Sequence, residues 1–198
     1  IMKKNKSLLI ITFIFFQFFL TTITFGDILK IGNENAKITV KVFSSLTCPH
    51  CASFHEKIFE KLKKEYIDIN RVKFEHHAFP LDLAALNAEK IVRCAKNSEA
   101  RFELLTKIYD KQKKWAVGSD IKKINKFLIK IGTNSGIGES DLRKCLENEE
   151  TQELILKERI EAQKEYNITS TPTIYINDKK YEDKHEFESF KRQIDKLL

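Results

Sequence analysis

Alternating apolar and polar residues predict two β-strands in the first half of the chain. Ile38, Val40 and Val42 alternate with lysine and threonine residues. Between residues 71 and 79, every second position again shares one side, namely Val72, Phe74, His76 and Ala78. Side chains on one face of a strand recur at every second residue, so both segments have the period of a strand.

A helix is predicted between these two strands. Apolar residues recur there at helical spacing, at Phe54, Ile58, Phe59, Leu62 and Tyr66. This spacing places them on one face of a helix. The order strand, helix, strand predicts a βαβ unit whose two strands are parallel.

The middle of the chain has helical periodicity and predicts five helices. They fall within residues 81–95, 102–109, 121–131, 142–146 and 152–166. We expect Gly132 to end the third helix, because glycine readily adopts the left-handed conformation of a helix C-cap.

The last part of the chain returns to a strand pattern. Residues 173–176 predict a strand, Asn177-Asp178 a turn and residues 180–182 a partner strand. A final amphipathic helix is predicted from the spacing of Phe187, Phe190, Ile194 and Leu197.

The composition is that of a globular protein with a real core. The chain has 198 residues, of which 42% are apolar and 32% charged, with only six Gly and three Pro. These values exclude collagen, proline-rich linkers and glycine-rich disorder. No Gly-rich phosphate loop is present, which argues against nucleotide binding. Beyond the N-terminus, no apolar run approaches the roughly 20 residues of a membrane helix.

The net charge is positive but its sources are scattered. It is +7 for the whole chain and +4 without the three lysines that precede residue 27. The other lysines are spread among Glu and Asp residues instead of being massed in one place. A protein that binds along the phosphate backbone of a nucleic acid needs a clustered basic face, so we expect no nucleic-acid partner.

The N-terminal segment, residues 1–26, has the pattern of a secretory signal peptide. Three lysines and no acidic residue precede an apolar stretch from Leu8 to Leu20. The small residues Thr24 and Gly26 would occupy the −3 and −1 positions of a cleavage site before Asp27. The alternative is an uncleaved membrane anchor. Export to the periplasm would place the four cysteines in an oxidising compartment.

Cys48-Pro49-His50-Cys51 follows the first predicted strand and begins the first predicted helix. Pro49 fits the first turn of a helix, where its missing N–H costs nothing. Unpaired backbone N–H groups at the helix start and the helix dipole stabilise a negative charge on Cys48. His50 is a further donor. A stabilised thiolate makes the disulfide of Cys48 and Cys51 oxidising, so we expect a redox-active pair.

Other roles for this motif fit the sequence less well. A structural disulfide is one alternative, and a zinc site formed by Cys48, His50, Cys51 and His55 is another. That ligand set would crowd one helix start with poor tetrahedral geometry, and His55 is expected at the surface instead. A c-type haem would need His where Ala52 follows the second cysteine. We therefore expect no metal and no cofactor.

The two motifs together resemble the DsbA family of thiol–disulfide oxidoreductases, within the thioredoxin superfamily. The resemblance rests on Cys48-Pro49-His50-Cys51, on the segment Thr171-Pro172-Thr173 before the late strand, and on the helical region between them. It implies an α/β, thioredoxin-like fold with an inserted helical domain. The thioredoxin-like domain would comprise residues 27–80 and 167–198, and the insertion residues 81–166.

The resemblance implies specific roles for the residues of the motif. Cys48 would be the exposed nucleophile that enters mixed disulfides, and Cys51 its buried partner. Pro49 and His50 would tune the redox potential. Near the C-terminus, Pro172 would be cis and lie beside the disulfide.

Thr171 would present backbone groups that pair with an extended substrate.

In one position this chain departs from the family pattern. Family members often have a buried acidic residue six positions before the first cysteine, and Val42 occupies that position here. Glu75 or His76 could substitute as proton acceptor for Cys51, although His76 on an apolar face is more simply a core histidine.

Cys94 and Cys145 remain outside the motif. Four cysteines allow three pairings, and a local pairing of Cys48 with Cys51 favours Cys94–Cys145. Some DsbA-like proteins have an extra structural disulfide of this kind. Two free buried thiols, or a second redox centre that modulates the first, are the alternatives.

The sequence thus predicts a periplasmic dithiol oxidase. Its substrates would be exported proteins with reduced cysteines, and the resemblance implies reoxidation by a quinone-linked membrane partner of the DsbB type. A disulfide isomerase or reductase is the first alternative, although isomerases of this superfamily usually have an additional dimerisation domain. A non-catalytic, chaperone-like module that binds peptides beside Thr171 and Pro172 is the second.

Overall fold

The computed structural model describes residues 28–198 of the chain. The predicted signal peptide, residues 1–26, and its interpretation as an anchor lie outside the described residues. Within residues 28–198, no helix has both the length and the apolar composition that crossing a bilayer requires.

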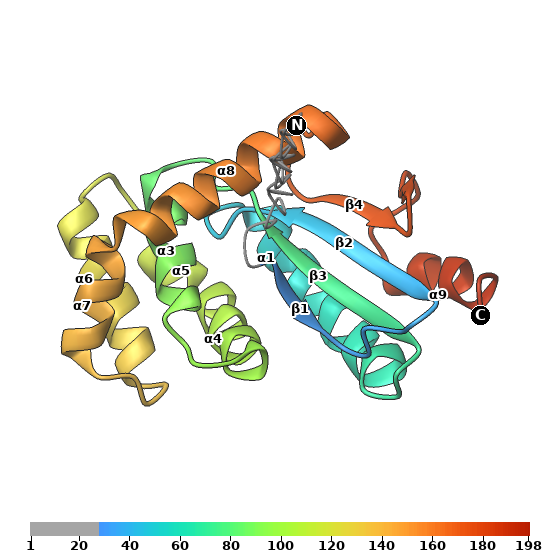
Figure 1. The fold of residues 1–198 in the computed structure, drawn as a ribbon, viewed down its shortest axis with the longest axis horizontal. Helices are drawn as coiled ribbons and strands as arrows, with labels where there is room; N and C mark the ends of the chain where they lie inside the picture. The colour runs from blue at the N-terminus through green and yellow to red at the C-terminus, as the bar shows by residue number, and fades with distance from the viewer. Residues whose placement is uncertain (1–27) are drawn as a thin grey trace, which may run out of the picture.

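A five-stranded sheet forms the centre of the fold, with strand order β1-β3-β2-β4-β5 (Figure 1). The strands are β1 Leu29–Ile31, β2 Ile38–Ser44, β3 Val72–Ala78, β4 Thr173–Ile176 and β5 Lys179–Lys180. The predicted βαβ unit is confirmed, because β2 and β3 are parallel and the other pairs are antiparallel. Strand β1 was not predicted, since three residues are too few to establish a period.

One continuous helical stretch connects β2 to β3. It consists of α1 Pro49–Phe54, η1 His55–Phe59, α2 Glu60–Leu62 and η2 Lys63–Ile67, where the η segments are π-helical. Its apolar side packs against one face of the sheet, as the sequence pattern predicts. Cys51, Phe54, Ile58 and Leu62 are buried there in the same cluster as Val40 and Val42.

Six helices lie between β3 and β4, most of them in a bundle beside the sheet (Figure 1). They are α3 Leu83–Arg93, α4 Ser98–Asp110, α5 Gln112–Trp115, α6 Ile121–Thr133, α7 Glu139–Glu147 and α8 Glu149–Tyr166. The long helix α8 runs from this bundle back over the second face of the sheet, where it contacts β3. The short α5 was not predicted.

Side-chain caps explain where four of these helices begin. The carboxylate or amide oxygen accepts a hydrogen bond from a backbone N–H in the first turn, which satisfies a donor that has no partner within the helix. The capping residues are Asp82, Asn97, Asp120 and Asn148. The last helix, α9 Phe187–Asp195, ends earlier than predicted and leaves Leu197 47% exposed.

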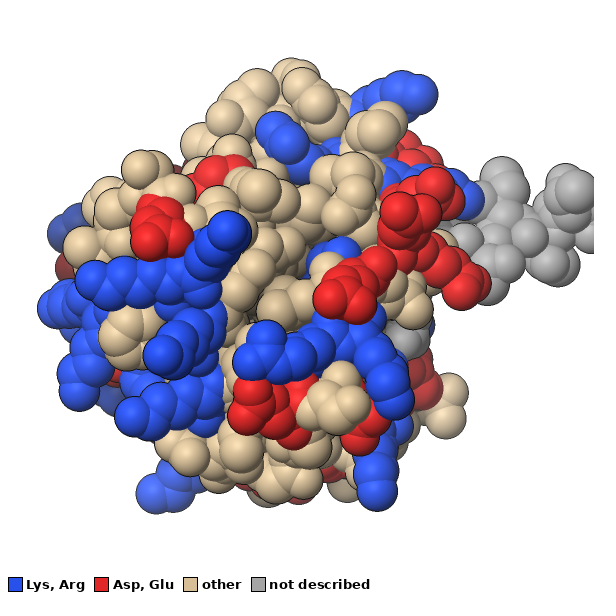
Figure 2. All heavy atoms as spheres, turned by 90° about the vertical axis from the view of Figure 1, so that its left-hand side faces the viewer, with Lys and Arg blue, Asp and Glu red and all other residues tan. Residues whose placement is uncertain are grey.

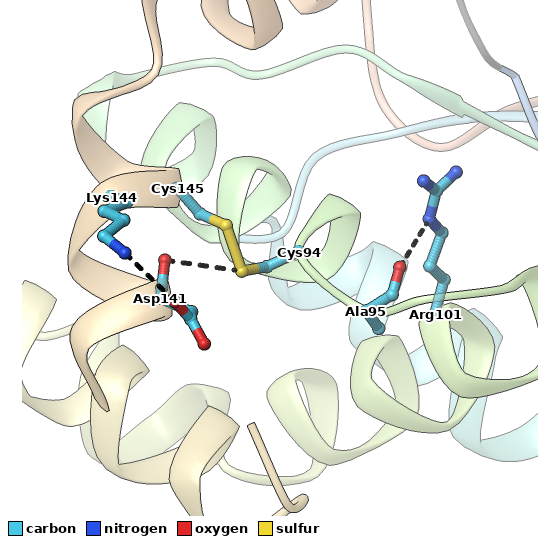
Figure 3. Close-up of a disulfide and its surroundings, with 6 residues drawn as sticks. All are labelled: Cys94, Ala95, Arg101, Asp141, Lys144 and Cys145. Atoms are coloured by element: carbon cyan, nitrogen blue, oxygen red, sulfur yellow. Dashed lines mark hydrogen bonds and ion pairs between the residues drawn. A yellow bond between two sulfur atoms is a disulfide. The ribbon is translucent and has the colours of Figure 1, made fainter. Parts of the chain in front are cut away.

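A disulfide joins Cys94 to Cys145 within the helical bundle (Figure 3). Cys94 caps the C-terminal end of α3 and Cys145 lies in α7. The Sγ atom of Cys94 also lies 3.7 Å from the carbonyl oxygen of Asp141 in α7. The disulfide therefore fixes the end of one helix to the side of another.

The prediction that Gly132 ends a helix is wrong. Gly132 lies inside α6, which continues to Thr133, and its backbone is not left-handed. Its role is packing, because α7 crosses α6 at this point. A Cβ atom built on Gly132 would lie 2.6 Å from Cδ2 and 2.8 Å from Cδ1 of Leu142.

We predict that Gly132→Ala destabilises the protein although alanine favours helices. The gain in helix propensity is about 1 kcal/mol. Leu142 is fully buried and presents both of its methyl groups to the new Cβ, so the leucine would have to shift within a packed core. We expect a net loss of about 1–2 kcal/mol in the free energy of unfolding, measured by urea denaturation.

The matched control is Thr133→Ala, an exposed neighbour in the same helix. It should change the free energy of unfolding by less than about 0.5 kcal/mol. Equal or increased stability of Gly132→Ala would show that the two helices separate without cost.

Candidate active site

The cysteine motif lies where β2 leads into the first helix. Cys48 is the N-cap of α1, with an extended backbone, and Pro49 is the first helical residue. The carbonyl oxygen of Cys48 accepts hydrogen bonds from the backbone N–H groups of Cys51 and Ala52, at 3.1 and 3.2 Å. Pro49 stands where a backbone N–H would have no partner, which explains why the helix tolerates it.

Both cysteines of the motif are free thiols, and neither is freely exposed. Cys51 is 1% exposed, and Cys48 is 8% exposed. The expectation of an exposed Cys48 is therefore wrong for the residue as a whole, because the segment before β4 covers it. The Sγ atom of Cys48 lies 3.3 Å from the carbonyl oxygen of Thr171, to which the protonated thiol donates. Pro49 and His50 are exposed at the rim.

The two thiols have opposite pKa shifts. A hydrogen bond from the thiol of Cys51 lowers the pKa of Cys48 to about 5, although burial opposes this change. A side-chain hydrogen bond from Thr171 and hydrogen bonds from the backbone N–H groups of Cys51 and His50 lower it further. Burial raises the pKa of Cys51 far above its ordinary range, and the adjacent Cys48 adds to this. Near neutral pH, Cys48 is therefore a thiolate and Cys51 a thiol.

The segment that faces Cys48 contains the second motif. The peptide bond between Thr171 and Pro172 is cis. The hydroxyl of Thr173 donates to the carbonyl oxygen of Ser170 at 2.7 Å, which braces the turn before β4. The structure thus brings Thr171 and Pro172 to the cysteine motif although more than 120 residues separate them in the chain.

Gln112 is a residue of the site that the sequence did not reveal. It lies in α5 and is 5% exposed. Its Nε2 atom donates to the carbonyl oxygens of Leu46 and Cys48, at 2.8 and 3.0 Å. Gln112 therefore links the helical bundle to the loop that positions Cys48. A glutamine beside several lysines has no pattern that predicts such a contact.

A groove with a volume of about 800 Å³ lies beside the motif, between the start of the first helix and α5. Its lining includes Thr47, Pro49, Ala52, Gln112 and Lys113. The groove reaches the rim of the site and offers room for a polypeptide segment next to Cys48.

Glu75 does not replace the acidic residue that is missing at Val42. Val42 faces the apolar cluster that contains Cys51, whereas Glu75 points to the opposite face of the sheet. There the carboxylate lies 3.1 Å from both Lys73 Nζ and His77 Nε2. Burial opposes ionisation, but these hydrogen bonds lower the pKa of Glu75 to about 2.

The histidines near the site have partners of their own. His76 lies on the side of Val42 and pairs with the buried carboxylate of Glu89 at 2.9 Å. His55 was expected at the surface but is 4% exposed, stacked on Phe59 and hydrogen-bonded to Thr106 at 2.8 Å. Burial lowers the pKa of His55 to about 3. Among residues 28–198, no cluster of three or more potential ligands could hold a metal ion.

We predict that the reduced protein forms one thiolate as the pH rises through about 5. The ultraviolet absorbance of the thiolate, followed against pH, measures this midpoint. Cys48→Ser should abolish the transition. Cys51→Ala should move it upward by more than one pH unit, because it removes the strongest hydrogen bond to the thiolate. A midpoint near 9 in the unaltered protein would contradict the prediction.

We predict that Gln112→Leu weakens the site through the backbone of the loop. Two buried carbonyl oxygens lose their donor, which costs about 1–3 kcal/mol of the free energy of unfolding. The midpoint of the Cys48 titration should also rise, since a looser loop holds the N–H donors less well. The matched control is Gln193→Leu on the exposed side of α9. An unchanged titration in Gln112→Leu would limit its role to stability.

Comparison with known proteins agrees with this geometry. The model of the thioredoxin family matches residues 24–196. A Rickettsia typhi protein, provisionally named a protein-disulfide oxidoreductase, is 28% identical over 90% of this chain and 66% of its own length. Disulfide bond formation protein D of Bacillus subtilis is 29% identical over 85% of this chain and 76% of its own length.

A solved structure, alpha-DsbA1 of Wolbachia pipientis, superposes with a TM-score of 0.81 and 25% identity. The match covers 86% of this chain and 90% of that structure. This chain spans between 52% and 66% of the lengths of the matched Rickettsia proteins. The resemblance inferred from the two motifs is confirmed: the chain belongs to the thioredoxin family, with a fold of the DsbA type and its helical insertion.

Proposed function

We propose that this chain is an exported dithiol oxidase that introduces disulfides into other proteins through Cys48 and Cys51. The main support is the pair of opposite pKa shifts, which makes Cys48 a stable thiolate and keeps Cys51 protonated. The names of the Rickettsia and Bacillus relatives are consistent with this chemistry. In this proposal, residues 27–80 and 167–198 form the catalytic domain, and residues 81–166 the insertion.

The reaction consists of two thiol–disulfide exchanges. In the oxidised chain, a substrate thiolate attacks Sγ of Cys48, and the bond between Cys48 and Cys51 breaks. The sulfur of Cys51 leaves with the electron pair and takes up a proton. A second substrate thiolate then attacks the substrate sulfur of the mixed disulfide and releases Cys48 as a thiolate. The substrate loses two electrons, and the chain gains them.

The low pKa of Cys48 favours transfer of the disulfide from this chain to the substrate. A thiol of low pKa is a good leaving group, so the mixed disulfide resolves in favour of the substrate disulfide. The stabilisation of the reduced chain is complete above pH 9, the ordinary pKa of the thiol. It decreases as the pH falls toward about 5, so the driving force is larger at neutral than at acidic pH.

Substrate and partners follow from the same proposal. Thr171 presents its backbone beside Cys48, where an extended substrate segment could pair with it. The substrates are exported proteins with reduced cysteines. A quinone-linked membrane protein of the DsbB type would reoxidise Cys48 and Cys51. Residues 1–26 would direct the chain to the periplasm.

The deciding experiment mixes the oxidised protein with a reduced peptide that contains two cysteines. We expect rapid, nearly complete formation of the peptide disulfide, with a rate that falls by at least about 1000-fold in Cys48→Ser. The matched control removes the other cysteine pair, as Cys94→Ala with Cys145→Ala. It should still oxidise the peptide, because this disulfide lies in the helical bundle.

Other results would support a different function. Little peptide oxidation, with the Cys48–Cys51 disulfide left intact, would refute a dithiol oxidase. Faster repair of a scrambled disulfide protein than oxidation of the peptide would favour an isomerase. Peptide binding that survives in Cys48→Ser, without oxidation by the unaltered protein, would favour a chaperone-like module.

A further inference from the structure

One helix of the bundle exposes a face of unusual composition. Along α6, the exposed residues besides Thr133 are Lys122, Lys123, Lys126, Phe127 and Lys130. With 3.6 residues per turn, these five positions fall within an arc of about 140°. We call this surface the α6 face. The opposite side of the helix is apolar and buried in the bundle.

The positive charges of the α6 face are not balanced by acidic residues in the same segment. Residues 121–138 contain four lysines and no Asp or Glu. Within residues 28–198, none of these four ammonium groups forms an ion pair, whereas Lys41, Lys73 and Lys191 do so elsewhere. A groove between α6 and α7 contains two carboxylates on its far side. Glu139 pairs with Arg143 at 2.5 Å, and Glu147 lines the groove.

The fold places further basic residues beside this cluster. Figure 2 views this end of the molecule and shows Lys and Arg side chains massed on one part of it. The neighbouring helix α5 packs against α6 and adds the exposed residues Lys113 and Lys114. Lys113 also lines the groove beside Pro49, so this basic region begins at the rim of the cysteine site.

The chemistry of the α6 face fits a planar array of phosphates. Lys122, Lys126 and Lys130 are spaced by single helical turns over about 12 Å, which suits separate anions better than one. Helix α6 contains no Arg, the residue that binds a single phosphate with two parallel hydrogen bonds. Phe127 is 38% exposed among the lysines and offers an aromatic ring to the headgroup region.

We propose that the α6 face binds the surface of a bilayer that contains anionic phospholipids. The lysines supply the electrostatic attraction, and Phe127 inserts at the boundary of headgroups and acyl chains. Such binding would hold the cysteine site close to a membrane, where a membrane partner could reoxidise it. The binding itself involves no cysteine, so its test is independent of the proposed redox activity.

The test uses residues 27–198, which contain every element of the described fold and exclude the apolar N-terminal segment. Flotation measures binding to phosphatidylcholine vesicles with and without phosphatidylglycerol, at low and at physiological salt. We expect binding only to the vesicles with phosphatidylglycerol. It should weaken as salt rises, because screening reduces attraction between exposed charges.

Two sets of substitutions distinguish the contribution of the α6 face to vesicle binding from that of the net charge of the protein. The first changes Lys122, Lys123, Lys126 and Lys130 to Gln. Each lysine near an anionic surface contributes a factor of about five to binding, so the affinity should fall by at least about 100-fold. The control changes Lys37, Lys64, Lys179 and Lys196, all exposed and without ion pairs among residues 28–198, to Gln. It should lower the affinity less than about threefold.

A third variant, Phe127→Ser, tests the aromatic contribution. It should weaken binding about threefold or more at both salt concentrations, since burial of apolar area is not screened. An unchanged Cys48 titration and unfolding transition in each variant would show that the fold is intact.

Three outcomes would overturn the proposal. The first is absence of binding to vesicles with phosphatidylglycerol. The second is an equal loss of affinity in the control set, which would reduce the effect to net charge. The third is binding of an acidic probe, poly-glutamate, through the same four lysines without binding to vesicles. That result would identify the α6 face as a site for acidic polypeptides.

Discussion

The site depends on keeping a negative charge on a sulfur that is almost enclosed by protein. Burial by itself raises the pKa of a thiol, so donors buried with Cys48 have to outweigh the loss of water. The Cys51 thiol and the N–H groups at the start of α1 do so. They are available only because the helix begins at Cys48, with Pro49 in its first turn. The junction between β2 and α1 therefore supplies the hydrogen bonds that stabilise the Cys48 thiolate.

The helical bundle contributes to this site as well as covering it. Gln112 reaches from α5 to the carbonyl oxygens on both sides of the loop before α1. Trp115, in the same short helix, is fully buried and its Nε1 donates to the carbonyl oxygen of Ile108 at 2.8 Å. The Cys94–Cys145 disulfide ties α3 to α7 within the bundle. Trp115 thus holds α5 against α4, and Gln112 of α5 in turn holds the loop of Cys48.

The sheet separates Cys51 from the carboxylate of Glu75. Val42 and Cys51 share the apolar face, while Glu75, Lys73 and His77 form an ion-paired group on the other. Adjacent residues of a strand point to opposite faces, so proximity along β3 does not bring Glu75 to Cys51. Within the described residues, the thiol of Cys51 thus lies in a site whose strand residue, Val42, cannot accept its proton.

Local patterns in the sequence determined the elements and the chemistry of the motif. Alternation predicted β2 and β3, helical spacing predicted the helices except the short α5, and the position of Cys48 before Pro49 predicted a stabilised thiolate. Contacts between segments that are distant in the sequence could not be predicted from local patterns, and only the tertiary structure revealed them. Packing of β4 beside β2 placed Thr171 on Cys48, and the crossing of α6 and α7 gave Gly132 its role. The contact of Gln112 and the position of Lys113 and Lys114 beside α6 also depend on how helices are oriented in the bundle. Periodicity shows which side of a helix is buried, but it does not show which other segment that side will meet.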